Sequence, residues 1–131
     1  MPAVGGLTLG KEERVTGRRL VEELFKGGGS RSMSYYPLRI VYQLVDRQQS
    51  GVRILVSVPK RCLKRAVWRN RVKRQVRESY RTNKHLLDEV MAARPDKTLA
   101  LAFIWLDDKI HETSQVEQRV RSLLIRLGEK L

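Results

Sequence analysis

The residues best suited to chemistry lie in one segment, residues 60–81, which is densely cationic. Ten of these 22 residues are Lys or Arg and Glu78 is the only acid, so the segment contributes +9 of the chain's formal net charge of +13. Seven of the ten cations are Arg, whose planar guanidinium forms paired hydrogen bonds with phosphate. Dense positive charge with so few acids is typical of surfaces that bind nucleic acid through its backbone.

Helical periodicity divides this segment into an apolar side and a charged side. Every fourth position on one side is apolar, which predicts a helix over residues 63–81 that is buried along that side. The apolar positions are Trp68, Val72, Val76 and Tyr80. The opposite half carries Lys64, Asn70, Arg71, Lys73, Arg74, Arg77 and Arg81. Arg65 and Arg69 fall toward the apolar side near the helix start, where they can reach around its end or line a cleft. A merely solvated face usually mixes acids with bases, so the pattern favours RNA binding.

Other reactive residue types show no catalytic arrangement. Cys62 is the only cysteine, which rules out an internal disulfide, and we expect it to be inert. His85 and His111 lie far from it in sequence and lack metal-ligand spacing. The acidic pair Asp107 and Asp108 follows a predicted strand and is interpreted as a turn. No catalytic or metal-binding residue is therefore predicted on the protein alone.

Length and composition are consistent with a single domain over residues 1–131. The chain has 41% hydrophobic residues, enough for one compact core. Residues 1–10 are expected to be a flexible arm without the features of a signal peptide. The most apolar run, residues 99–106, is too short to span a bilayer, so a cytoplasmic location is expected.

The remaining elements follow from periodicity and breakers. A helix is predicted from Thr16 or Gly17 to the glycines at 27–29, and strands over residues 38–45 and 52–58 are predicted to pair as an antiparallel hairpin. A short helix over residues 84–92, a central strand over 99–106 and a last helix follow. Ser114 and Glu117 form a capping-box pattern. The core stripe of the last helix is Val116, Val120, Leu123, Leu124 and Leu127. The order α-β-β-α-β-α predicts an α+β, two-layer α–β sandwich.

One stretch of the basic segment resembles the signature of a known family. Residues 64–74, KRAVWRNRVKR, followed by Arg77-Glu78 and Tyr80-Arg81, are similar to the signature of the bacterial ribonuclease P protein family. The run of residues 57–61, SVPKR, and the N-terminal residues 11–14 and 25–27 also match, so the resemblance covers roughly residues 9–127.

The resemblance implies a fold and a function. The fold has a small, mainly antiparallel sheet with an unusual left-handed β-α-β crossover around the basic helix. The protein acts as a subunit of an endoribonuclease whose catalytic RNA, with bound Mg²⁺, removes the 5′ leader of precursor tRNA. The implied partners are therefore that RNA and precursor tRNA, with neither a membrane nor an obligate protein partner. The residues expected to bind RNA are Lys64, Arg65, Arg69, Asn70, Arg71, Lys73, Arg74, Arg77 and Arg81.

A cleft for the single-stranded leader is also implied by the resemblance. Its expected residues are Val21, Phe25, Tyr42, Ser57, Lys60 and Arg61. Phe25 and Tyr42 are the flat groups on which bases can stack. Each also continues an apolar stripe, so either can equally belong to the core.

Three other functions use some of the same features. A structural ribosomal protein would also be small and basic. A DNA-binding protein could place the basic helix in a major groove, although a strand rather than a helix precedes it. A self-sufficient nuclease would need an acid–base pair or a metal site, for which Asp107 and Asp108 are the only adjacent acids near a strand end.

Overall fold

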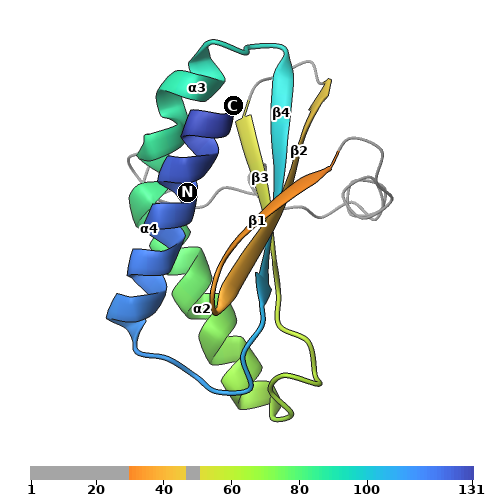
Figure 1. The fold of residues 1–131 in the computed structure, drawn as a ribbon, viewed down its shortest axis with the longest axis vertical. Coiled ribbons are helices and arrows are strands. Elements are labelled where there is room, and N and C mark those ends of the chain that lie inside the picture. The colour runs from red at the N-terminus through yellow and green to blue at the C-terminus, as the bar shows by residue number, and fades with distance from the viewer. Residues whose placement is uncertain (1–29, 47–50) are drawn as a thin grey trace, which may run out of the picture.

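The computed structural model describes residues 30–46 and 51–131, which form a sheet covered on one face by a layer of helices (Figure 1). The strands are β1 (Arg31–Tyr35), β2 (Leu38–Asp46), β3 (Gly51–Ser57) and β4 (Lys97–Trp105). The helices are α2 (Ala66–Asn83), α3 (Asp88–Ala92) and α4 (Thr113–Lys130), with a 3-10 turn, η2 (Lys84–Leu87), between the first two. The predicted α+β sandwich is confirmed for these residues. The helix predicted from residue 16 or 17, and the arm at residues 1–10, lie outside them.

The strand β4 lies inside the sheet, in the order β1-β2-β4-β3. It pairs antiparallel with β2 and parallel with β3. Its two faces are both buried, with Leu101 and Phe103 on the helix side and Ala100 and Ala102 on the other side. The predicted central strand is confirmed, but the predicted hairpin between residues 38–45 and 52–58 is wrong. A strand that is apolar on both faces gains most from an inner position, so β4 separates the two.

The edge strand β1 was not predicted from the sequence. Its residues RSMSY include only two apolar side chains, Met33 and Tyr35, and all five residues are exposed or half-buried. It pairs antiparallel with β2, where Tyr35 lies opposite Leu38. The sheet is therefore mainly antiparallel, as expected, with β1–β2 as its only hairpin among the described strands.

The main core lies between the helices and the sheet. Every residue of the predicted stripe of α4 is buried, at 0–1% exposure. On α2, Val72, Val76 and Tyr80 are buried as predicted, and the Tyr80 ring packs edge-on against Phe103 with centroids 6.3 Å apart. Each fully buried aliphatic side chain contributes about 1.5–3 kcal/mol to folding, so this core holds both helices on the sheet.

The start of α4 differs from its prediction. The helix begins at Thr113, and its N-cap is Glu112, whose side chain makes no capping hydrogen bond. Glu117 instead accepts a hydrogen bond of 2.7 Å from Asn83 Nδ2 of α2. The predicted capping box of Ser114 and Glu117 is therefore wrong. The Glu117 carboxylate instead links α4 to α2.

The helix α2 connects two parallel neighbours, β3 and β4, and so forms a β-α-β crossover. Its left-handed sense stays a prediction. The helix begins at Ala66, three residues later than predicted, because the backbone N–H groups of Cys62 and Leu63 both donate to Pro59 O in a turn. The predicted short helix is confirmed as η2 and α3. No helix among the described residues has an apolar stretch long enough to cross a bilayer.

Candidate nucleic-acid interface

The outer face of α2, which we define as Asn70, Arg71, Arg74 and Arg77, is exposed along its whole length. The same helix buries Val72 and Val76 completely. Because the buried positions are anchored in the core, the exposed positions must project away from it. The predicted division of this helix into an apolar and a charged side is confirmed.

The arginines of this face have no partner within the part of the chain that the structure describes. Among the described residues, no hydrogen bond or ion pair involves the side chains of Arg71, Arg74 or Arg77. Three successive arginines lie at spacings of three residues, or about 4.5 Å of rise per step, on one rigid helix. Their guanidinium groups are therefore available to an external polyanion.

One predicted member of the face is engaged inside the protein. Arg81 Nε donates to Glu78 Oε1 at 3.0 Å, and the two side chains form an ion pair. This hydrogen bond lowers the pKa of the Glu78 carboxyl and raises the pKa of the Arg81 guanidinium. Glu78 is the only acid of α2, so it neutralises Arg81 and leaves the three arginines before it free.

Polar contacts fix how α2 is rotated about its axis. Gln75, Ser79 and Asn83 are buried, at 3–6% exposure. Gln75 Nε2 donates to His111 O and Thr113 Oγ1, both at 3.0 Å, and Asn83 joins Glu117 as described above. Hydrogen bonds of this kind hold only in one orientation. Apolar periodicity alone does not reveal these three residues, because their side chains are polar.

A second group of cations surrounds the start of α2. Lys60, Arg61, Lys64 and Arg65 are exposed in the loop that leads into the helix. Arg69 is half-buried, because its Nη1 donates to Leu63 O at 2.9 Å and to Lys64 O at 2.7 Å. The Arg69 side chain does extend around the start of the helix, as predicted, and its hydrogen bonds there hold the loop that precedes α2. The first turn of α2 contains no acid, so the partial positive charge of the helix N-terminus adds to these cations.

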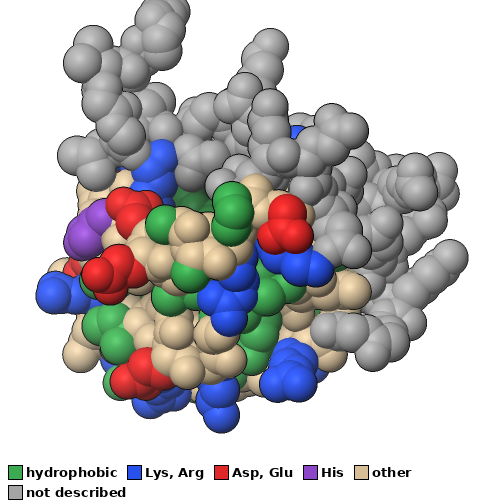
Figure 2. All heavy atoms as spheres, turned by 90° about the horizontal axis from the view of Figure 1, so that it is seen from above, with side chains coloured by type: hydrophobic (Ala, Val, Ile, Leu, Met, Phe, Trp, Pro, Cys, Tyr) green, Lys and Arg blue, Asp and Glu red, His purple; other side chains and the backbone are tan. Residues whose placement is uncertain are grey.

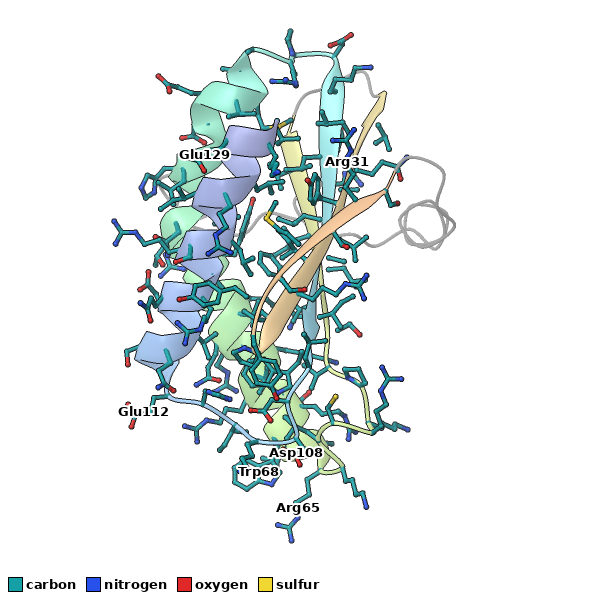
Figure 3. The ribbon with its side chains drawn as sticks, viewed as in Figure 1. Arg31, Arg65, Trp68, Asp108, Glu112 and Glu129 are labelled. Carbon is teal, nitrogen blue, oxygen red and sulfur yellow. The ribbon has the colours of Figure 1, made fainter. Side chains whose placement is uncertain are left out.

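The two ends of the molecule differ in charge pattern. Figure 3 places Arg65 and Trp68 at the end where α2 begins. The opposite end, which Figure 2 shows from above, has acidic and basic side chains interspersed. This end therefore lacks the long run of cations that α2 and its leading loop carry.

The predicted leader cleft is not assembled as expected. Tyr42 is 5% exposed and lies on the helix side of the sheet with Leu38 and Ile40. Ser57 aligns with Ile104, and Ile104 packs with the cluster on the other face. Tyr42 and Ser57 therefore point to opposite faces, so one cleft cannot hold both side chains. Val21 and Phe25 lie outside the described residues.

The turn after β4 carries a small polar cluster. Asp107 Oδ2 lies 2.6 Å from His111 Nε2, and Asp107 Oδ1 accepts a hydrogen bond of 2.8 Å from Asp108 N. A hydrogen bond with Asp107 raises the pKa of Tyr36. Burial acts to raise the pKa of Asp107, but its hydrogen bonds with His111 and Tyr36 outweigh burial and lower it. The predicted turn is confirmed, and the cluster stabilises the approach to α4.

Metal-ligating side chains are not gathered in the described part of the chain. Within residues 30–46 and 51–131, no three His, Cys, Asp or Glu side chains are placed to hold a metal ion. Cys62 is half-buried, and its Sγ lies 3.7 Å from Trp105 O.

Together, the fold and the outer face of α2 define a small, basic α+β protein that presents a rigid row of free arginines. A comparison with protein families finds that residues 9–128 match the model of the family described as Ribonuclease P. The chain is 40% identical to a ribonuclease P protein component of Porphyromonas gingivalis over 128 residues, covering 97% of this chain and 90% of that protein. It is 30% identical to the corresponding component of Chlorobaculum tepidum, covering 91% and 82%. This chain belongs to the ribonuclease P protein family.

Solved structures agree on the fold. The RNase P protein from Thermotoga maritima superposes with a TM-score of 0.67 at 22% identity, covering 87% of this chain and 96% of that one. The Staphylococcus aureus RNase P protein gives a TM-score of 0.59 at 17% identity, covering 89% and 95%.

Proposed function

We propose that this chain is the protein subunit of ribonuclease P, and that the outer face of α2 docks on the catalytic RNA. In this role the chain assists Mg²⁺-dependent hydrolytic removal of the 5′ leader from precursor tRNA in the cytoplasm. The observation that carries the proposal is the row Arg71, Arg74 and Arg77, which is exposed, has no partner among the described residues, and is adjacent to Asn70.

The chemistry of this row suits a folded RNA. Each guanidinium can form two parallel hydrogen bonds with a phosphate, which ties binding to a defined orientation. The short amide of Asn70 projects from the same face and can contact a base edge, a 2′-OH or a metal-bound water. A rigid helix with such groups matches a structured RNA surface better than a flexible tail would.

The chemical step itself is assigned by this proposal to the RNA and its bound Mg²⁺. The protein contributes positive charge and positioning, which favour binding of two polyanions at once. Lys60, Arg61 and Arg65 are placed beside the start of α2, where they can attract the leader's phosphates. Ser57, at the end of β3 nearest this loop, belongs to the same proposed path. The roles of Val21 and Phe25 stay predictions, whereas Tyr42 lies on the helix side of the sheet and not on this path.

Reconstitution tests the proposal. The purified chain, the catalytic RNA of the same organism and a precursor tRNA are mixed at low Mg²⁺, and mature 5′ ends are followed with time. Mature ends should form faster with the chain than with RNA alone. Arg71→Ala combined with Arg74→Ala should abolish most of this gain in rate. The same double variant should reduce the slope of log K for RNA binding against log salt concentration by about 2.

Two changes away from this face provide the control. Arg121→Ala and Lys109→Ala remove the same charge from exposed positions on α4 and in the loop before it, and should leave the gain largely intact. Equal losses in both double variants, or no acceleration by the unaltered chain, contradict the proposed docking.

A further inference from the structure

A second set of aromatic and cationic residues lies where β1 meets α4. We define this β1–α4 seam as Arg31, Tyr35, Arg119, Arg126 and Lys130. The Tyr35 ring has the guanidinium carbons of Arg119 and Arg126 at 4.3 Å and 5.0 Å from its centroid. Arg119 Nε also donates to Tyr36 O at 3.0 Å. Two arginines of α4 are thereby held against one aromatic ring of β1.

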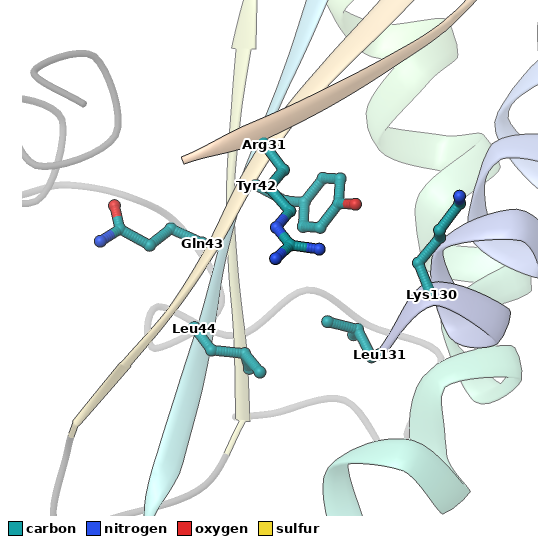
Figure 4. A pocket seen from close by; sticks show the side chains of 6 residues that line it. All are labelled: Arg31, Tyr42, Gln43, Leu44, Lys130 and Leu131. Atoms are coloured by element: carbon teal, nitrogen blue, oxygen red, sulfur yellow. The ribbon is translucent and has the colours of Figure 1, made fainter. Parts of the chain in front are cut away.

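The seam continues into a cavity. The cavity has a volume of about 290 Å³ and is lined by Arg31, Tyr42, Gln43, Leu44, Lys130 and Leu131. Figure 4 shows the Tyr42 ring extending from β2 toward the end of α4, with the Arg31 side chain beside it and Lys130 across from it. The Gln43 side chain points away, so the cavity combines apolar walls with two cations.

The positions on α4 form a single stripe. Arg119, Arg126 and Lys130 are separated by seven and four residues, which places them within about 40° of one another around the helix and over about 16 Å along it. Among the residues that the structure describes, none of these three, nor Arg31, forms an ion pair. The stripe is therefore a line of positive charge, alongside an aromatic ring and a cavity, that no acid of the described residues neutralises.

Stacking prepares these arginines for binding. A guanidinium held on an aromatic face keeps its N–H edge free for hydrogen bonds, and its restricted motion lowers the entropy lost when it binds an anion. Single-stranded nucleic acid is bound by surfaces of this composition, in which cations follow the phosphates and apolar or aromatic groups receive the bases. A duplex keeps its bases stacked inside and cannot fill the cavity.

The seam is separate from the outer face of α2. The helix α4 contacts α2 through Glu117, which lies about 200° around α4 from Arg119. The seam thus occupies the flank of α4 that faces β1 rather than α2. One RNA on α2 leaves the seam accessible to another segment.

We propose that the β1–α4 seam binds a single-stranded RNA segment, with phosphates on Arg31, Arg126 and Lys130 and a base in the cavity between β2 and the end of α4. The site is additional to the docking of α2 and does not depend on it. Arg119, which is tied to Tyr36 O, orients the stack.

Binding of a short oligonucleotide by the full chain tests the seam. The probe is a fluorescent oligouridylate of about ten nucleotides, measured by anisotropy at several salt concentrations. Arg126→Gln with Lys130→Gln should weaken binding about tenfold and lower the salt slope by about 1.4, since each phosphate contact of a single strand contributes about 0.7. The matched control is Arg121→Gln with Lys109→Gln, which removes the same charge elsewhere and should change affinity less than about twofold. All four side chains are exposed, so thermal unfolding should be unchanged.

Two results overturn the proposal. Equal weakening by the seam variant and the control shows that the seam contributes only general charge. Competition by oligoglutamate of the same charge, as effective as unlabelled oligouridylate, assigns the seam to acidic protein instead of RNA. Binding of the structured catalytic RNA is measured in parallel with Arg71→Ala and Arg74→Ala, so failure of the α2 proposal and failure of the seam proposal are read from different variants and different probes.

Discussion

The helices α2 and α4 have the same length, 18 residues, and lie in the same layer, yet they are held in different ways. On α4 the buried residues are all aliphatic, five of them at 0–1% exposure. On α2 half of the six buried residues are polar and make directional contacts. The hydrophobic effect is non-directional, whereas hydrogen bonds define an angle. The buried residues of α4 therefore hold that helix to the core by apolar packing. The orientation of the charged face of α2 depends on the polar contacts of that helix as well as on its apolar residues.

Their outward sides differ in a corresponding way. Within α2, six cations face one acid, and that acid is paired with the last cation, Arg81. Within α4, four cations and two acids are present, and the cations divide between the β1 flank and Arg121. A helix that tolerates so much unpaired charge must be stabilised by its neighbours, since self-repulsion opposes folding.

Removing a core side chain of α4 should have the largest effect on stability. Leu124→Ala leaves a cavity at a residue with 0% exposure, and we expect a loss of about 2–5 kcal/mol in the free energy of unfolding. Urea unfolding followed by circular dichroism measures it. The adjacent Ile125, which is 45% exposed, provides the control, and Ile125→Ala should lose less than about 0.5 kcal/mol. Similar losses for both would contradict the role given to the buried stripe.

Breaking the tie between the helices should have an intermediate effect. Asn83→Ala removes the donor to Glu117 Oε2 and the hydrogen bond to Ser79 O, and we expect a loss of about 1–3 kcal/mol. Gln115→Ala, at an exposed position of α4, is the control. A double-mutant cycle with Glu117→Ala isolates the pair, and strictly additive losses would show that the two side chains do not act together.

Local pattern was sufficient for the helices and insufficient for the sheet. The four-residue spacing from Val72 to Tyr80 predicted which side of α2 is buried, because one helix is a rigid unit with a fixed period. Strand order was missed because it depends on how much apolar area each strand buries against strands that are distant in sequence. Nothing in the sequence of β2, β3 or the segment that joins them indicates that β4 lies between these two strands.

The candidate site shows the same contrast between helix residues, which were placed correctly, and strand residues, which were not. Arg71, Arg74 and Arg77 were placed correctly on an exposed side by helical period alone. Tyr42 and Ser57 were assigned to one cleft, but alternation only says which residues of a strand share a face. Which face of the sheet each set occupies depends on long-range pairing. The seam could not be predicted, since Tyr35 lies in an unpredicted strand and is 84 residues from Arg119.

The smallest effect that we predict is a change in RNA affinity on removing Glu78, the only acid of α2. It tests whether the scarcity of acids on α2, compared with α4, favours RNA binding. Glu78→Gln removes the carboxylate that pairs with Arg81, so this cation is no longer neutralised by the acid of α2. We expect severalfold tighter binding of the catalytic RNA at low salt, with a salt slope steeper by up to about 1, because one more phosphate contact becomes possible. Stability should change little, since Glu78 is exposed to solvent and Arg81 is partly exposed. Glu89→Gln removes an equal charge from the exposed face of α3 and is the control. If both variants tighten binding equally, net charge alone explains the gain, and Arg81 does not belong to the interface even when Glu78 no longer neutralises it.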